Sequence, residues 1–287
     1  MTAAAALPVV ETDPLRMRDA ILSLRRAGRR VGFVPTMGAL HAGHASLVAR
    51  AAAECDDVVV SIFVNPTQFS PQEDFSRYPR SLEADCRLVA QSGAGLVFAP
   101  HAATAYPPGH ATSIVVAGPT ADFEGRIRPG HFSGVATVVC WLVNVVPADI
   151  AYFGAKDWQQ TVVVRRMVAD LALPIRIEVC PTVREEDGLA MSSRNGYLSA
   201  ADRLRAGALY ASLLLAASRW DAGESVATIE AAMEEVLVAR GVNVDYARLV
   251  EPETLLPPRP GAGVVALVAG KLGTTRLIDN LLLPARP

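Results

Sequence analysis

The sequence lacks closely spaced cysteines and long hydrophobic runs. None of its four cysteines lies in a C-x-x-C pattern, which argues against a zinc site or a disulfide framework. The most apolar segment, 135–146, is shorter than the about 20 residues that a membrane-spanning helix needs. Thr137 and Asn144 also interrupt it, so we expect a buried helix there. The cysteines are Cys55, Cys86, Cys140 and Cys180.

The chain also lacks an excess of charge of either sign. It has 27 Lys and Arg against 29 Asp and Glu, a net charge of -2, which gives no electrostatic reason to expect nucleic acid or an anionic membrane as partner. The short apolar run at the N-terminus has no basic residue before it, so it does not resemble a signal peptide. We therefore expect a cytoplasmic protein.

The 287 residues are enough for two domains. Up to residue 180, β-branched runs alternate with helical patterns, as in a parallel sheet with crossover helices. The expected strands are RVGFVP, DVVVSIFV, GLVFAP, DIAYF and IRIEVCP, and the expected helices are 45–54, 81–91, 133–146 and 158–172. This pattern predicts an α/β domain with a doubly wound, Rossmann-like parallel sheet over residues 1–180.

Residues 181–287 have a different character. Ala- and Leu-rich helices are expected over 200–220 and 224–240, followed by two strands, VDYARLVE and VVALVAGKL, with a loop rich in Pro and Gly between them. This part of the chain predicts a second, smaller α+β domain. The boundary is expected between Val179 and Ser199.

The stretch TMGALHAGH follows the strand VGFVP and precedes a helix. Open α/β sheets bind ligands at the carboxyl ends of their strands, and a helix N-terminus attracts phosphate. His41 and His44 lie three residues apart, so both project from the same side of the first turn. Capping and packing alone would explain two such histidines, but the strand, the Gly-bearing turn and the helix together favour nucleotide phosphate binding.

Three more polar blocks are candidates, two of them directly after expected strands and the third, MSSRN, at the expected domain boundary. Asn65 and Gln68 in IFVNPTQF carry amides that suit a substrate with a hydroxyl and a carboxylate, although Asn-Pro alone is typical of a turn. In FGAKDWQQ, a lysine can meet phosphate and an aspartate can accept from ribose hydroxyls, although a surface Lys-Asp pair is common. MSSRN supplies two hydroxyls and an arginine that could follow a leaving pyrophosphate, or it is only a linker.

PTMGALHAGH, IFVNPTQF, FGAKDWQQ and REEDGLAMSSRN occur in an order and at spacings that resemble the pantothenate synthetase (pantoate–beta-alanine ligase) family. The first block resembles the HxGH signature of the nucleotidyl-transferring superfamily, and MSSRN resembles its mobile KMSKS-type loop. The resemblance implies that the smaller domain acts as a lid, whose closure brings this loop over ATP. RPGHFSGVATVV and KLGTTRLIDN extend the resemblance over nearly the whole chain. Ala155 and Trp158 stand where the family commonly has Glu and Tyr, which leaves the side-chain roles of these positions open.

The resemblance implies site residues. The residues assigned to pantoate are Gln68, Gln160 and Asn65, and the residue assigned to beta-alanine is Gln68. The catalytic set is His44, His41, Lys156 and Arg194. The residues assigned to ATP are Met37, Gly38, Ala39, Leu40, His41, Ala42, Gly43, His44, Gly154, Ala155, Lys156, Asp157, Val183, Met191, Ser192, Ser193 and Arg194.

Two weaker candidates have a solvated surface charge as the alternative. Asp85 is a candidate ligand for a Mg²⁺ ion that ATP and water bind mainly, and Arg128 is a candidate phosphate contact. His101, His110 and His131 receive no functional assignment from the sequence.

The reaction implied is a two-step ligation. The pantoate carboxylate attacks the α-phosphorus of ATP, which gives pantoyl adenylate and pyrophosphate, and the amine of beta-alanine then displaces AMP to form pantothenate, a coenzyme A precursor. The expected partners are these small molecules, with no nucleic acid and no membrane, and the resemblance implies a homodimer. Two alternatives share the HxGH loop: a nucleotidyltransferase or tRNA-charging enzyme, and a non-catalytic nucleotide sensor.

Overall fold

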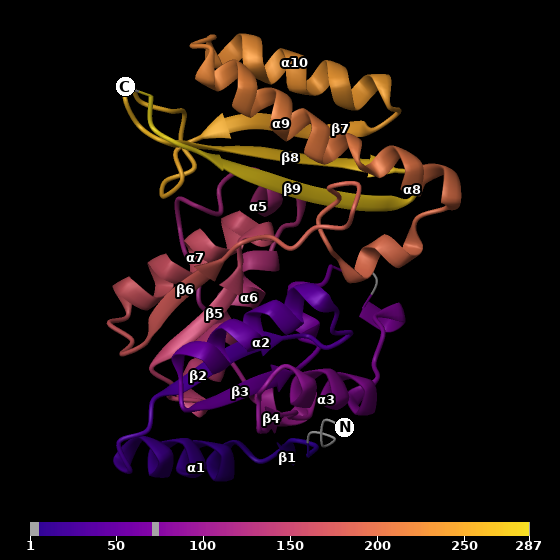
Figure 1. The fold of residues 1–287 in the computed structure, drawn as a ribbon. Coiled ribbons are helices and arrows are strands. Elements are labelled where there is room, and N and C mark those ends of the chain that lie inside the picture. The colour runs from indigo at the N-terminus through magenta and orange to yellow at the C-terminus, as the bar shows by residue number, and fades with distance from the viewer. Residues whose placement is uncertain (1–5, 71–74, 287) are drawn as a thin grey trace. The chain divides into compact units, whose positions relative to one another are not determined.

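A computed structural model describes residues 6–70 and 75–286 of the chain (Figure 1). It separates into two compact units, of which the first holds residues 1–154 and 163–180 and the second holds 155–162 and 181–287. The FGAKDWQQ block therefore spans a change of unit: Gly154 lies in unit 1, and Ala155 to Gln160 lie in unit 2.

Unit 1 is built on a six-stranded parallel sheet with the order β1-β4-β3-β2-β5-β6. Its strands are β1 (Val9–Glu11), β2 (Val31–Thr36), β3 (Asp57–Ile62), β4 (Leu96–Phe98), β5 (Ile150–Gly154) and β6 (Arg176–Cys180). The chain runs outward from β2 to β4 and then returns to β5 on the other side of β2. The strand order therefore reverses between β2 and β5, which is where open α/β sheets bind ligands.

Helices cover both faces of this sheet, because alternate strand residues are apolar toward each face. Phe33 and Val59 pack in a core with α1 (Pro14–Arg26), α6 (His131–Val145) and the later part of α7 (Trp158–Asp170). Val34 and Val60 pack in another with α2 (Ala42–Glu54) and α3 (Leu82–Gln91). The other helical segments among the described residues up to Cys180 are α4 (Ala102–Ala105), α5 (Glu124–Ile127), η1 (Pro66–Gln68), η2 (Phe75–Arg77) and η3 (Ala155–Asp157).

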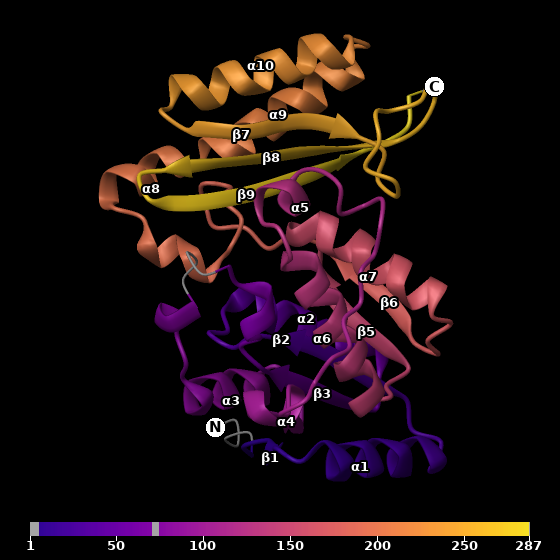
Figure 2. The same ribbon diagram turned by 180° about the vertical axis from the view of Figure 1, so that it is seen from behind.

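Unit 2 contains a three-stranded antiparallel sheet of β7 (Asn243–Val250), β8 (Val264–Leu272) and β9 (Thr275–Leu283). Helices α9 (Ala208–Asp221) and α10 (Val226–Ala239) lie on one face of it (Figures 1 and 2). Helix α8 (Ala200–Ala206) and the short η4 (Ser193–Tyr197) precede them.

The predicted fold class, a doubly wound parallel sheet with a smaller α+β part, is confirmed, but several elements differ from the expectation. The sequence analysis did not predict helix α1 or the short helices α4 and α5. The single helix expected over 200–220 is two helices that meet at Gly207. Strand β1 was missed because it is only three residues long. Strand β9 was missed because its alternation is broken by adjacent buried polar residues, Asp279 and Asn280. Among the described residues, no helix is long and apolar enough to cross a membrane.

Candidate active site

The loop after β2 and the start of α2 place both histidines of HxGH at a helix N-terminus. His41 is the N-cap of α2, and its Nδ1 accepts from the Gly43 backbone N-H at 3.1 Å. The His44 Nδ1 accepts in turn from the His41 backbone N-H at 3.3 Å, which completes a capping box. The ring centroids are 4.1 Å apart. A neutral imidazole accepts through one nitrogen and carries its proton on the other, so both rings carry a donor N-H at Nε2.

The turn before His41 has an unusual backbone. Gly38 and Ala39 both have positive φ, 82° and 52°, and a Cβ on Gly38 would lie 3.0 Å from a carboxylate oxygen of Asp85. A left-handed conformation is costly for alanine, so the surroundings must hold it there.

Asp85 is the residue that holds this turn. Its side chain is buried on α3, where one carboxylate oxygen accepts from the Leu40 N-H at 2.8 Å and the other from the Ala39 N-H at 3.1 Å. Hydrogen bonds to both oxygens explain why an aspartate is buried at this point. Among the described residues, no group of three or more His, Cys, Asp or Glu side chains could hold a metal ion. A role of Asp85 as a magnesium ligand therefore stays a prediction. Its observed contacts are those of a residue that supports the loop.

Asn65 and Gln68 lie together beyond the end of β3, and both are buried. The Asn65 amide donates to the Gln68 Oε1 at 3.1 Å and to the Gly134 carbonyl at 3.1 Å, and its Oδ1 accepts from the Tyr106 hydroxyl at 2.7 Å. The Gln68 Nε2 lies 3.0 Å from the Met37 Sδ. Asn65 therefore orients Gln68 next to the first residue of the HxGH loop.

Helix α6 supports the same segment from its N-terminal turn. The His131 Nδ1 donates to the Gln68 carbonyl at 2.8 Å, and the Arg128 Nη1 lies 3.1 Å from the His131 Nε2. A Cβ on Gly134 would lie 2.5 Å from the Thr67 carbonyl oxygen, so only glycine allows this approach. These contacts place Arg128 beside His131 and Gln68, and a phosphate contact by Arg128 stays a prediction.

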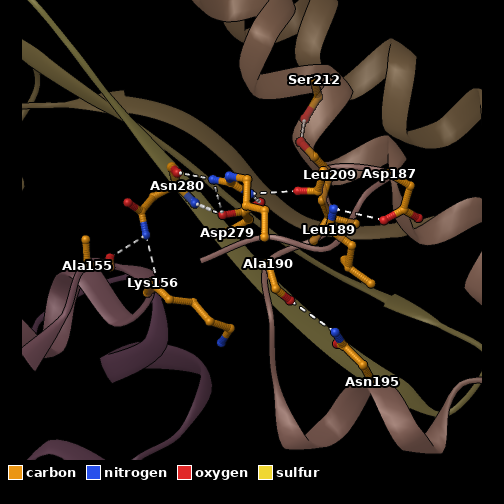
Figure 3. Close-up of polar contacts among 12 residues, drawn as sticks. Ala155, Lys156, Asp187, Leu189, Ala190, Asn195, Leu209, Ser212, Asp279 and Asn280 are labelled. Carbon is orange, nitrogen blue, oxygen red and sulfur yellow. Dashed lines mark hydrogen bonds and ion pairs between the residues drawn. The ribbon is translucent and has the colours of Figure 1, made fainter. Parts of the chain in front are cut away.

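In unit 2, Lys156 and Asp157 lie in η3, immediately before α7, and Gln160 lies in the first turn of that helix. The Lys156 Nζ is 3.8 Å from the Asp157 carboxylate. The Asn280 side chain donates to the carbonyls of Ala155 and Lys156 at 2.9 and 2.8 Å (Figure 3). The sequence interpretation missed Asn280, although the KLGTTRLIDN motif marked this stretch.

Residues 183–195, the serine-containing loop, form a hairpin-like segment of unit 2. Arg184 and Ala190 form an antiparallel bridge, and the Met191 N-H donates to the Val183 carbonyl at 3.0 Å. Ser192 caps η4, because its hydroxyl accepts from the Arg194 N-H at 3.2 Å. The Asn195 amide donates to the Ala190 carbonyl at 3.1 Å (Figure 3). Residues 183 and 191–194 are therefore parts of one folded loop.

Charged contacts fix the far end of that loop. Arg203 of α8 pairs with Glu185 at 2.8 Å and also with Asp187. The hydrogen bond from Arg203 lowers the pKa of the Asp187 carboxyl, and hydrogen bonds from Arg203 and Asn195 lower that of Glu185.

Comparison with known proteins identifies the family of this chain. The family model for pantoate-beta-alanine ligase matches residues 10–282. Pantothenate synthetase from Acidiphilium cryptum is 53% identical over 268 residues, which are 92% of this chain and 96% of that protein. The crystal structure of pantothenate synthetase from Thermus thermophilus superposes with a TM-score of 0.89 at 49% identity, covering 95% of this chain and 98% of that one.

A further solved structure carries ligands. Pantoate-beta-alanine ligase from Francisella tularensis, described as complexed with beta-gamma ATP and beta-alanine, matches with a TM-score of 0.79 at 33% identity, over 96% of this chain and 97% of that one. The family match, which covers nearly the whole chain, shows that this chain belongs to the pantoate–beta-alanine ligase family.

Proposed function

We propose that the residues described above carry out the family's reaction in this chain with the roles given below. The chain is an ATP-dependent ligase that joins pantoate and beta-alanine to pantothenate through pantoyl adenylate and releases AMP and pyrophosphate. The observation that carries the assignment of roles is the capping box of His41 and His44, because it leaves each imidazole proton on Nε2 at a helix N-terminus.

The first step needs stabilisation of negative charge on phosphate. When the pantoate carboxylate attacks the α-phosphorus of ATP, charge builds on the departing pyrophosphate. Fixed N-H donors at a helix start suit this task, because they are oriented before the reaction and need no reorganisation. His44 and His41 are the proposed donors, and Lys156 and Arg194 are the proposed cations at the phosphates.

Pantoate must be held with its carboxylate near the α-phosphorus. Gln68 is fixed by Asn65 and by Met37, so its amide is oriented before substrate arrives. We assign Gln68 and Gln160 to pantoate, and Gln68 also to beta-alanine. Asn65 acts on pantoate mainly through Gln68, because its own amide already makes the contacts described above.

The other proposed ATP contacts lie in the loop after β2, in the turn after β5 and in the serine-containing loop. The backbone from Met37 to His44 and from Gly154 to Asp157 is proposed to contact ATP, as are Val183 and the segment Met191 to Arg194. Mg²⁺ would be bound mainly by the nucleotide's phosphates and water, where it would supply further charge neutralisation. A homodimer, a cytoplasmic location and closure of unit 2 as a lid belong to the same proposal.

Pyrophosphate release tests the function directly. The purified chain with Mg-ATP should release pyrophosphate only when pantoate is added, and beta-alanine should then yield pantothenate and AMP. Release that depends on a different acid would indicate another adenylating enzyme, and ATP binding without release would indicate a nucleotide sensor.

A further inference from the structure

Strand β9 carries two adjacent buried polar residues, Asp279 and Asn280, which are 2% and 6% exposed. Neighbouring residues of a strand project to opposite faces, so the pair can serve two different segments. The Asn280 Nδ2 reaches the carbonyls of Ala155 and Lys156, as Figure 3 shows. One side-chain nitrogen therefore fixes two successive carbonyls of η3.

Asp279 is bound to the other segment, the base of the serine-containing loop. The Arg184 guanidinium makes a two-pronged contact with its carboxylate, at 2.6 and 3.1 Å. The Arg184 Nη2 also donates to the Asn280 carbonyl at 3.3 Å, and the Asn280 N-H donates to the Asp279 Oδ1 at 2.8 Å. Burial raises the pKa of the Asp279 carboxyl, while Arg184 acts in the opposite direction.

Arg184 is itself held from two further sides. Its Nη1 donates to the Gly188 carbonyl at 3.0 Å, and its guanidinium carbon lies 4.0 Å from the centre of the Tyr210 ring. The position of Gly188 is equally constrained, because a Cβ there would lie 2.2 Å from the Tyr210 ring. One network of polar contacts thus joins the base of the loop to the middle of β9.

We propose that Asn280 is a positioning residue for ATP use. Held by Asp279 and Arg184, it fixes the position of the Ala155–Lys156 turn relative to the loop that carries Ser192 to Arg194. The inference rests on the proposed function, in which both segments contact ATP. An asparagine is needed because its neutral amide offers two N-H donors from one atom, whereas a carboxylate of the same shape offers none.

Asn280→Asp tests this role with almost no change of size. It replaces two donors by acceptors facing two carbonyls, so adenylate formation should slow about tenfold or more. The KM for ATP should rise while the KM for pantoate changes little. Asn243→Asp, an exposed site on β7 with the same chemical change, is the matched control and should behave like the parent. If Asn280→Asp does not fold, Asn280→Ser is measured in the same way. Its side chain is neutral but too short to reach both carbonyls.

A double-mutant cycle with Lys156→Ala separates positioning from general damage. If Asn280 acts through Lys156, Asn280→Asp should add little to the loss caused by Lys156→Ala, whereas independent effects would multiply and overturn the proposal. A loss with Lys156→Ala but none with Asn280→Asp would also overturn it, and would leave the proposed function standing. Lys156→Ala without effect on ATP use would remove Lys156 from the proposed site and the positioning role with it.

Discussion

The two units orient the residues that are proposed for the reaction in different ways. In unit 1 the histidine pair is oriented by contacts three residues apart or fewer, since each ring caps the same helix start. In unit 2 the turn at Lys156 is held by Asn280, which lies 124 residues away in the chain. Arg184, at the base of the serine-containing loop, is held by Asp279, which lies 95 residues away. Local contacts are visible in a sequence pattern, whereas contacts across such distances depend on the fold of the whole unit.

The largest effect is expected where the local contacts of unit 1 are broken. His44→Ala removes a fixed donor from a site where negative charge develops, which should slow pyrophosphate release about 10²- to 10³-fold. Preformed pantoyl adenylate with beta-alanine should still react at a rate closer to the parent's. Single-turnover measurement of each half-reaction provides the check.

His101→Ala is the matched control for that experiment, because His101 is exposed and its side chain makes no cap hydrogen bond. Equal losses in both half-reactions would mean that His44 positions the adenylate generally. An unchanged first half-reaction would remove His44 from the mechanism.

A smaller effect is expected at Gln68, which a longer-range contact with α6 supports within unit 1. Gln68→Ala leaves polar groups of bound pantoate without partners, at a cost of about 1 to 3 kcal/mol. Calorimetry should show weakened pantoate binding with ATP binding nearly unchanged. Gln91→Ala, at an exposed position on α3, is the control, and unchanged pantoate affinity in Gln68→Ala would refute the assignment.

A substitution of Asp85 shows whether the turn before α2 needs the support that it receives from α3. Asp85→Asn keeps one acceptor but turns an NH₂ group toward one of the two loop N-H groups, which should cost about 1 kcal/mol or more of stability. Amide exchange of residues 39 and 40 should become faster. Glu83→Gln on the same helix is exposed and should leave both unchanged. Normal exchange combined with lost magnesium dependence would favour the metal role instead.

The smallest effect is expected in the charged contacts of unit 2. The pKa values of Glu185 and Asp187 are lowered in the folded chain, so the contribution of their contacts with Arg203 is present above the unfolded values, near 4, and is lost as pH falls through the folded ones. Arg203→Gln should remove no more than about 1 kcal/mol at neutral pH. Thermal unfolding should show a difference from the parent that shrinks as the pH is lowered toward 3. A difference independent of pH would mean that packing of the arginine stem, and not its charge, stabilises the loop.

Residues that the sequence indicated without the structure share a local signal. The HxGH loop, the amides of IFVNPTQF and the MSSRN loop each follow a strand or a boundary that hydrophobic periodicity reveals. Residues that it missed or could not assign act from a distance: His131 lies in the first turn of a helix far along the chain, and Asn280 sits in a strand that its own buried polar residues concealed. The sequence makes Asp85 a candidate, but nothing in its helix indicates that it binds the backbone of a loop 45 residues earlier.

The sequence by itself determined the parallel sheet, the family and the histidine pair, because β-branched runs, helical periodicity and a helix cap are properties of residues that are close in the chain. Tertiary structure alone decided which groups orient the site residues, since Asp85, His131 and Asn280 meet their partners only after strands and helices pack. Burial also decided the chemistry of these groups: away from water, each polar atom must find a partner, and those partners hold the turn at Ala39, the backbone at Gln68 and the carbonyls at Lys156 in place.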